Sequence, residues 1–369
     1  MIRVLQIVTD MRCGGLETML MNYYRQIDRT QVQFDFLVHR ENEGEYSEEI
    51  QKLGGNIYHL PKLNPFSRYY KKALGMFFDS HPEYQIIHVH QDCLSSVILK
   101  VAKEHGVKIR IAHSHSNSQD KNIKYPIKLF YKRFIPRYAT SLFACSEEAG
   151  RWMFNGADFT VLNNAIDAER YIFNPQKRNE VRDSFGIASD ELLVGHVGRF
   201  SPAKNHDFLI DVFDAVPKSQ KAKLLLVGKG DLKESVEEKV KKLKLENRVI
   251  FAGLRSDVPD IMQAMDVLVL PSLYEGLGIV AIEAQASGLP CVLSDAVPDE
   301  AVLTDLAVKM LPDSSPSKWV DAINKQSKMI RKSTYDEIRF AGYDIKDNSK
   351  KLQEYYLRLA KGEKNICLY

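Results

Sequence analysis

The stretch LPSLYEGLGIVAIEAQASGLP, residues 270–290, carries the pattern that decides the fold. It is typical of a buried strand, a turn with two glycines, and a helix that ends at Gly288-Leu-Pro290. Glycines in the turn let a ligand approach the backbone, and free N–H groups at a helix start bind phosphate oxygens. The stretch therefore predicts a phosphate-binding site in an α/β domain.

Two carboxylates belong to this element. Glu275 lies in the turn, and Glu283 lies one to two helical turns further along. We expect one to bind sugar hydroxyls and the other ribose hydroxyls. Two glutamates at this spacing are, taken alone, common surface residues of helices, so the interpretation depends on the cations and glycines that accompany them.

Two cations follow the predicted strand 192–197, in the run Gly198-Arg199-Phe-Ser-Pro-Ala-Lys204-Asn205. Ligands of open α/β sheets bind at the carboxyl ends of strands. Arg199 can bind two phosphate oxygens at once, and Lys204 adds a point charge. Negative charge grows on a diphosphate as it leaves, so such cations stabilise the transition state more than the ground state.

Strand and helix patterns alternate along the whole chain, which predicts parallel sheets. The pattern restarts after the polar stretch 174–190, and 369 residues are too many for one hydrophobic core, so we expect two domains with a hinge near 165–175. Residues 347–361 have apolar side chains at helical spacing and predict an amphipathic helix. The predicted strands are 1–8, 32–38, 86–90, 108–114, 141–146, 192–197, 222–227, 249–252, 267–270 and 291–294, and the run 161–167 is typical of a strand that ends in a tight turn. Helices are expected at 17–26 and 94–104.

Composition excludes several classes of protein. A net charge of +3 gives no argument for nucleic-acid binding. The sequence has no run of about 18 apolar residues, so we expect no membrane span. Five scattered cysteines without a C-x-x-C pair fit a reducing compartment and neither a disulfide framework nor a thiolate zinc site. The apolar opening turns polar at Thr9-Asp10, as a strand does and a signal peptide does not. We expect a cytoplasmic protein.

The N-terminal half offers its own candidates. Asp10 and the pair Gly14-Gly15 follow the first strand and open a helix, where main-chain amides can bind a diphosphate. The asparagines at 163–164 predict a tight turn in which Asn takes the left-handed conformation.

Two His-x-His pairs, His88/His90 and His113/His115, lie at strand ends, and strand alternation places each pair on one face. This arrangement permits a metal-dependent hydrolase, with Asp10 or Asp92 completing the ligands. Structural imidazoles are the simpler interpretation, and a hydrolase has no use for the phosphate-binding set. A non-catalytic nucleotide-binding protein is a third possibility, whereas a dinucleotide oxidoreductase is disfavoured because G-x-G-x-x-G is absent.

Two segments, 68–78 and 121–137, combine cations with aromatic residues, and the second has six cations and no anion. Helices that lie on anionic membranes have this composition. Core helices with solvated lysines are the alternative.

These elements, together with Asp266-Val-Leu-Val-Leu-Pro271-Ser272, resemble the family-4 retaining glycosyltransferases. The likeness covers nearly the whole chain. The run from Glu283 to Asp295 resembles most the bacterial enzymes that build capsular polysaccharide or exopolysaccharide.

The resemblance implies an α/β GT-B fold, in which two Rossmann-like domains with parallel sheets face a cleft. The acceptor-binding domain would be 1–167 together with a C-terminal helix, 347–369, that crosses back to it, and the nucleotide-sugar-binding domain would be 168–346. Carried over residue by residue, the resemblance implies a catalytic set of His113, Arg199, Lys204 and Glu275. The donor-binding set would be Gly14, Gly15, Gly198, Arg199, Lys204, Gly253, Leu254, Glu275, Gly276, Leu277, Gly278, Ile279 and Glu283, and the acceptor set Asp10, His90 and His115.

The implied reaction is retaining transfer of a hexosyl group from a UDP-sugar to a saccharide or lipid-linked saccharide, with no metal and no cofactor. The leaving phosphate itself would help to deprotonate the acceptor hydroxyl. We expect an enzyme of the cytoplasm, peripheral on the inner face of the cell membrane through segments 68–78 and 121–137.

Overall fold

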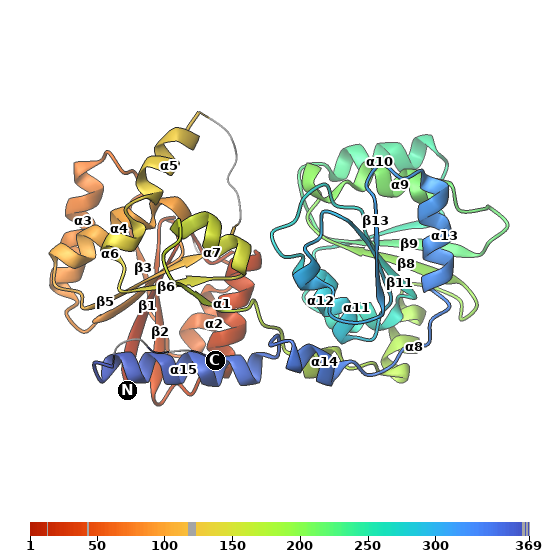
Figure 1. Ribbon diagram of the computed structural model, residues 1–369. Helices are drawn as coiled ribbons and strands as arrows, with labels where there is room; N and C mark the ends of the chain where they lie inside the picture. The colour runs from red at the N-terminus through yellow and green to blue at the C-terminus, as the bar shows by residue number, and fades with distance from the viewer. Residues whose placement is uncertain (13, 43, 117–122, 364–365, 367, 369) are drawn as a thin grey trace. The chain divides into compact units, whose positions relative to one another are not determined.

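The computed structural model describes residues 1–369 except 13, 43, 117–122, 364, 365, 367 and 369. Cys13, Cys367 and residues 121–122 of the second basic segment thus lie outside the described residues. The chain divides into two compact units, Met1–Ile166 with Asp344–Tyr369, and Asp167–Tyr343 (Figure 1). The division falls one residue before the boundary expected after 167.

The first unit is built on a seven-stranded sheet in the order β3-β2-β1-β4-β5-β6-β7. Among the described residues, all strand pairs of this sheet are parallel, so the carboxyl ends of the strands share one edge. The strands are β1 (Ile2–Val8), β2 (Val32–Val38), β3 (Ile57–His59), β4 (Ile86–Val89), β5 (Ile109–Ser114), β6 (Ser141–Ala144) and β7 (Thr160–Val161).

Helices cover both faces of this sheet and give it two apolar cores. One core joins the sheet to α1 (Gly15–Gln26), α2 (Ser47–Lys52) and α15 (Ile345–Ala360). The other joins it to α3 (Arg68–Ser80), α4 (Ser95–Glu104), α6 (Ile135–Tyr138) and α7 (Glu147–Phe154). The 3-10 turn η1 (Asp92–Leu94) precedes α4, and α5 (Tyr125–Lys132) packs against both.

The C-terminal helix α15 belongs to the first unit. It packs against α1 and buries Leu352, Tyr355 and Tyr356 in that core, which explains the apolar stripe of the predicted amphipathic helix (Figure 1). Asp344 caps its start by accepting from two backbone N–H groups. A parallel bridge joins Ile166 to Asp344, so the chain leaves and re-enters this unit at adjacent positions.

The second unit is built on a six-stranded sheet in the order β10-β9-β8-β11-β12-β13, again with parallel pairs. The strands are β8 (Leu192–Val197), β9 (Ala222–Val227), β10 (Val249–Gly253), β11 (Val267–Leu270), β12 (Cys291–Ser294) and β13 (Ala307–Met310). The helical elements are η2 (Ala168–Tyr171), α8 (Pro175–Ser184), η3 (Pro202–Lys204), α9 (His206–Asp214), α10 (Lys233–Lys242), α11 (Val258–Ala264), α12 (Ile279–Ala286), η4 (Asp299–Ala301), α13 (Pro316–Gln326) and α14 (Tyr335–Phe340).

Local expectations fail in three places. The strand expected from residue 161 onward is only Thr160–Val161, and neither Asn163 nor Asn164 has a positive φ. The short strands β3 and β13 were not predicted. Of the six cations in the second basic segment, Lys132 is buried and donates to the carbonyl of Trp152, so it is no surface charge. Among the described residues, no helix is long and apolar enough to cross a membrane.

Candidate functional site

The carboxyl edge of the second sheet gathers most of the predicted donor residues. Gly198 and Arg199 follow β8, and the stretch from Pro271 to Gly278 follows the neighbouring strand β11. Two backbone-directed contacts join these loops: Leu273 N donates to the Ala203 carbonyl at 2.8 Å, and Asn205 Nδ2 donates to the Pro271 carbonyl at 3.2 Å.

An ion pair between Lys204 and Glu275 forms the centre of this site. Lys204 Nζ lies 2.6 Å from Glu275 Oε1, and the side chains are only 18% and 9% exposed. Ser272 Oγ donates to the same carboxylate oxygen at 2.7 Å. A lysine ammonium has three donors, so the pair leaves Lys204 able to bind an anion while Glu275 Oε2 can accept from a hydroxyl.

Glycines let the loops approach closely enough for this pair to form. A Cβ on Gly198 would lie 3.3 Å from Lys204 Cδ and Cε, so the lysine stem passes against the glycine backbone. Gly228 and Gly230, after β9, pack on the carbonyls of Gly198 and Phe200, where a Cβ would come within 2.0 and 2.4 Å. Sequence reasoning missed this second glycine pair, although its position after a predicted strand was the available signal.

The turn before α12 places a glycine at the start of the helix, as expected from the sequence. Gly278 is the N-cap of α12 with φ of 78°, a left-handed conformation that glycine adopts without the strain a Cβ causes. Leu277 is buried beneath the turn while Gly276 is exposed, and Ile279 begins the helix. The first backbone N–H groups of α12 therefore follow Glu275 closely in sequence. They lie on the same edge of the sheet as the Lys204–Glu275 pair.

Glu283 lies further along α12, where burial raises the pKa of its carboxyl to about 7. Its side chain is hydrogen-bonded with that of Tyr171 in η2. Sequence reasoning missed Tyr171, because its contact with α12 depends on how the start of the second unit folds back. The tyrosine hydroxyl that pairs with this carboxyl group holds it in position.

Arg199 and the end of β10 lie nearer the solvent. The Arg199 side chain is 69% exposed and its Nη2 lies 3.2 Å from Asp231 Oδ2, whose side chain is 89% exposed. The structure thus brings Lys204, Glu275 and Ser272 together but places Arg199 beside Asp231. Gly253 ends β10 with φ of 70° in open space, and Leu254 is 50% exposed.

In the first unit, Asp10 and the glycines lie at the carboxyl end of β1. Arg12 forks onto the Asp10 carboxylate, with Nη2 at 2.7 Å and Nε at 3.1 Å. Gly14 is the N-cap of α1, Gly15 is its first residue, and the Glu17 carboxylate lies over this helix start, since a Cβ on Gly14 would meet Glu17 Oε2 at 2.4 Å. Burial, with Asp10 nearby, raises the pKa of Glu17 to about 7.

The four histidines form one cluster at the ends of β4 and β5. The ring centroids of His88 and His113 are 5.1 Å apart, and those of His113 and His115 are 4.0 Å apart. A hydrogen-bond chain runs from Gln6 Oε1 to His90 Nε2 at 2.9 Å and from His90 Nδ1 to His115 Nε2 at 2.7 Å. Burial lowers the pKa of all four, to about 3 for His88 and His115.

The histidine candidates differ in access. His113 is 1% exposed, and neither of its ring nitrogens has a hydrogen-bond partner within the part of the chain that the structure describes. His90 is 4% exposed, whereas His115 is only partly buried. His88 Nδ1 contacts the Tyr356 hydroxyl at 2.7 Å, which makes it a structural link to α15.

Ligand atoms of His88, His90 and His113 lie within 4.8 Å of one another. The rings of His88 and His90 are stacked with an interplanar angle of 25°, and those of His88 and His113 with 17°. The lone pairs of an imidazole lie in its ring plane, so stacked rings do not direct them at one point as a tetrahedral site requires. Both nitrogens of His90 are already hydrogen-bonded. This geometry disfavours the hydrolase.

Comparisons with known proteins show the family of this chain. The family model described as "Glycosyl transferases group 1" matches residues 177–333, and "Glycosyltransferase Family 4" matches 13–170. A putative glycosyltransferase of Bacillus subtilis, EpsF, is 35% identical over 370 residues and 96% of each chain. The galactosyltransferase of Escherichia coli named for UDP-Gal and α-D-GlcNAc-diphosphoundecaprenol is 25% identical over 58% of each chain.

Among solved structures, Anabaena HepE in complex with UDP and glucose matches with a TM-score of 0.80 at 19% identity, over 97% of this chain and 100% of that one. The two Rossmann-like units, the match to the HepE structure and the match to the group 1 family model together define a glycosyltransferase of the GT-B fold. The chain belongs to glycosyltransferase family 4.

Proposed function

We propose that this glycosyltransferase moves a sugar, with retention of anomeric configuration, from a UDP-sugar to a lipid-linked saccharide in exopolysaccharide synthesis. The observation that carries the proposal is the Lys204–Glu275 pair beside the glycine turn of α12. It places a cation, a carboxylate and helix amides on one edge of a parallel sheet. A nucleoside-diphosphate sugar presents the matching groups: a diphosphate and sugar hydroxyls.

In this proposal the second unit binds the donor. Lys204, with Arg199 and the amides from Gly276 to Ile279, neutralises the diphosphate as it leaves. Glu275 accepts from the donor sugar's hydroxyls, Glu283 accepts from the ribose, and the exposed end of β10 at Gly253–Leu254 contacts the base. The UDP in the HepE complex and in the name of the E. coli relative supports uridine as the base.

The first unit binds the acceptor. Asp10, His90 and His115 lie at the carboxyl ends of the neighbouring strands β1, β4 and β5. His113, buried beneath this edge, supports the reacting end of the donor sugar. Gly14 and Gly15 add backbone N–H groups to the donor-binding set. With every histidine of the cluster lowered in pKa, a neutral imidazole accepts a hydrogen bond but leaves proton removal to the departing phosphate.

Neutralisation of the diphosphate by side chains and amides needs no divalent ion. Retention follows if the acceptor attacks on the face from which the phosphate departs, since that phosphate then takes the proton. The lipid-linked acceptor is supported by the diphosphoundecaprenol in the name of the E. coli relative. An enzyme with that acceptor would work in the cytoplasm at the inner face of the membrane, with segments 68–78 and 121–137 in contact with lipid.

A direct test incubates the full chain with radiolabelled UDP-glucose, UDP-galactose or UDP-N-acetylglucosamine and undecaprenyl-diphosphate saccharides, in buffer with EDTA. The expected result is label in the organic phase and an α linkage in the product by NMR. GDP-sugars serve as the matched control. A β linkage contradicts retention, a need for added Mg²⁺ contradicts metal independence, and label from GDP-sugars alone contradicts the uridine assignment.

A further inference from the structure

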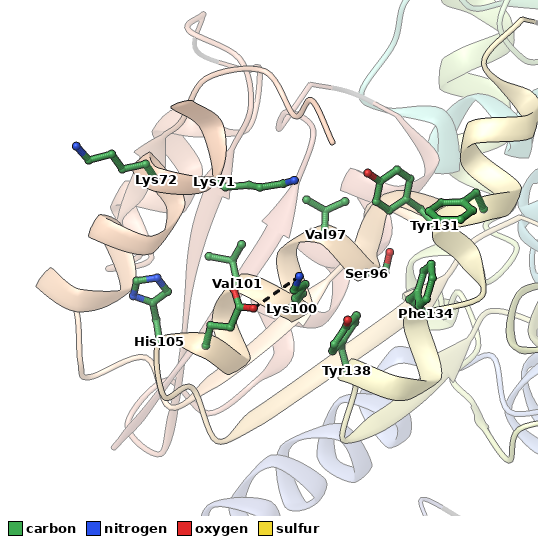
Figure 2. A pocket seen from close by; sticks show the side chains of 12 residues that line it. Lys71, Lys72, Ser96, Val97, Lys100, Val101, His105, Tyr131, Phe134 and Tyr138 are labelled. Carbon is green, nitrogen blue, oxygen red and sulfur yellow. Dashed lines mark ion pairs between the residues drawn. The ribbon is translucent and has the colours of Figure 1, made fainter. Parts of the chain in front are cut away.

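A pocket of about 450 Å³ lies in the first unit, away from the catalytic candidates (Figure 2). It is bounded by helices α3, α4, α5 and α6, of which α4 packs against the other three. Its volume is in the range of small-molecule sites. Its walls are formed by Lys71, Lys72, Ser96, Val97, Lys100, Val101, Glu104, His105, Phe130, Tyr131, Phe134 and Tyr138.

One wall of the pocket is aromatic. Figure 2 shows Tyr131, Phe134 and Tyr138 facing the valines and lysine of α4 across the hollow. Phe130 completes this wall and is 49% exposed. Rings that stay partly open to water have apolar area left to cover, which an apolar ligand would bury.

The opposite wall carries positive charge. Lys71 and Lys72 lie on α3, and neither has an ion-pair partner among the residues that the structure describes. Lys100 Nζ lies 3.7 Å from Glu104 Oε1, which is long for an ion pair. Ser96, which is 1% exposed, has a hydroxyl without a hydrogen-bond partner in the described part of the chain. Figure 2 shows Lys71 directed toward the hollow and Lys72 directed away from it. The Lys71 ammonium and the Ser96 hydroxyl both line the pocket, and such groups can bind an anion such as a phosphate.

Exposed apolar side chains lie on and just before α3, one of the helices that bound the pocket. Phe66, Tyr69 and Met76, on or just before α3, are 66%, 71% and 59% exposed, and the ring of Phe66 contacts that of Tyr131 in the aromatic wall at 6.3 Å. Large apolar side chains exposed together mark an interaction site. Combined with lysines, they match the interface of an anionic bilayer, in which rings enter the headgroup region and ammonium groups stay at its surface.

We propose that this pocket binds one anionic phospholipid of the membrane, with its phosphate between Lys71 and Ser96, Lys72 adding positive charge at the outer rim, and its first methylenes along the aromatic wall. The proposal deepens the membrane contact proposed above and rests on it. Asp10, His90 and His115 are not among the residues that line the pocket, so the lipid site is distinct from the proposed acceptor set. The bound lipid orients the first unit on the membrane surface.

The first experiment measures binding of the full chain to vesicles of phosphatidylcholine alone and of phosphatidylcholine with phosphatidylglycerol. The Lys71→Gln/Lys72→Gln variant lowers binding to the anionic vesicles about 25-fold, since each lysine near an anionic surface contributes about fivefold. The matched control is Lys241→Gln/Lys242→Gln, which removes the same charge from exposed positions of α10 in the other unit. Equal binding by the two double variants, or equal binding to both vesicle types, would overturn the proposal.

The second experiment tests the pocket rather than the surface, using monomeric dihexanoyl phosphatidylglycerol and, separately, inorganic phosphate. The short lipid raises the melting temperature of the wild type by mass action, and Phe130→Ser reduces that rise. A rise of equal size with inorganic phosphate would overturn the lipid assignment, and no rise with the lipid would overturn the pocket.

The UDP-induced rise in melting temperature is recorded in every variant. It stays at the wild-type value in Lys71→Gln/Lys72→Gln, because those lysines lie outside the donor site. Loss of the UDP response in the wild type would refute the donor assignment and leave the vesicle result to be judged by itself. A lipid failure with a normal UDP response refutes only this inference.

Discussion

Glu275→Gln separates donor binding from transfer, because Glu275 is bonded to the cation that is proposed to hold the diphosphate. At 2.6 Å and an effective dielectric constant of 20, the attraction between Lys204 and Glu275 is about 6 kcal/mol before desolvation is subtracted. Desolvation offsets most of it, and glutamine keeps the shape and one hydrogen bond. We expect the free energy of unfolding to fall by about 1–3 kcal/mol. For a unit of this size that lowers the melting temperature by about 2–12 °C.

The two functional readouts move in opposite directions. Removing the carboxylate charge frees Lys204 and removes repulsion of the diphosphate, so UDP binds about fivefold more tightly. Transfer falls about 10- to 150-fold, because a charge-assisted hydrogen bond to the donor sugar is lost.

Calorimetry with UDP, thermal unfolding and the radiolabel transfer assay give these three quantities. The control is Glu237→Gln on α10, whose pair with Lys233 is 2.8 Å long but more exposed, and its change should stay within about 0.5 kcal/mol. Weaker UDP binding by Glu275→Gln, or transfer at the wild-type rate, would refute the reasoning.

Three further changes test other parts of the structure. Burial raises the pKa of Glu283 from 4.5 to about 7, so the free energy of unfolding should fall as pH rises from 4.5 to 7. Chemical denaturation at several pH values should show a smaller fall in Glu283→Gln. A fall as large as in the wild type would refute the role of Glu283. Tyr356→Phe removes the hydrogen bond to His88 and should cost about 1–3 kcal/mol of unfolding free energy; a cost near zero would mean that α15 is held by apolar contacts alone. Gly278→Ala should lower the free energy of unfolding by about 1–2 kcal/mol, because the residue has a positive φ, and should weaken UDP binding. The control is Gly186→Ala, at a position with φ of 62° in open space. It should lower the free energy of unfolding by a similar amount and leave UDP binding intact.

The buried strands were predictable because apolar residues make up most of each one. The bounds of β2, β8, β9, β11 and β12 are those expected from the sequence. Strands β3 and β13 are short and contain no fully buried residue, so their side chains carry little of that signal. They exist because a neighbouring strand offers unpaired backbone groups, which sequence composition does not record.

The residues of the site were predictable one by one, but not their partners. Glycines, a lysine and two glutamates at strand ends indicated a diphosphate site. The Lys204–Glu275 contact depends on how closely two loops approach, and that depends on Gly228, which is distant in sequence. Burial of His113 could not be foreseen either, since His-x-His at a strand end is compatible with both a buried and an exposed ring.

The bridge between Ile166 and Asp344 has a consequence for synthesis on the ribosome. The second unit is one continuous segment and can fold as soon as it emerges. The first unit cannot close its core until α15 arrives with Leu352 and Tyr356, after the whole second unit has been made. Of the two units, the one that is made first is therefore the one that matures last, and a premature stop before α15 would leave a finished second unit attached to an open first sheet.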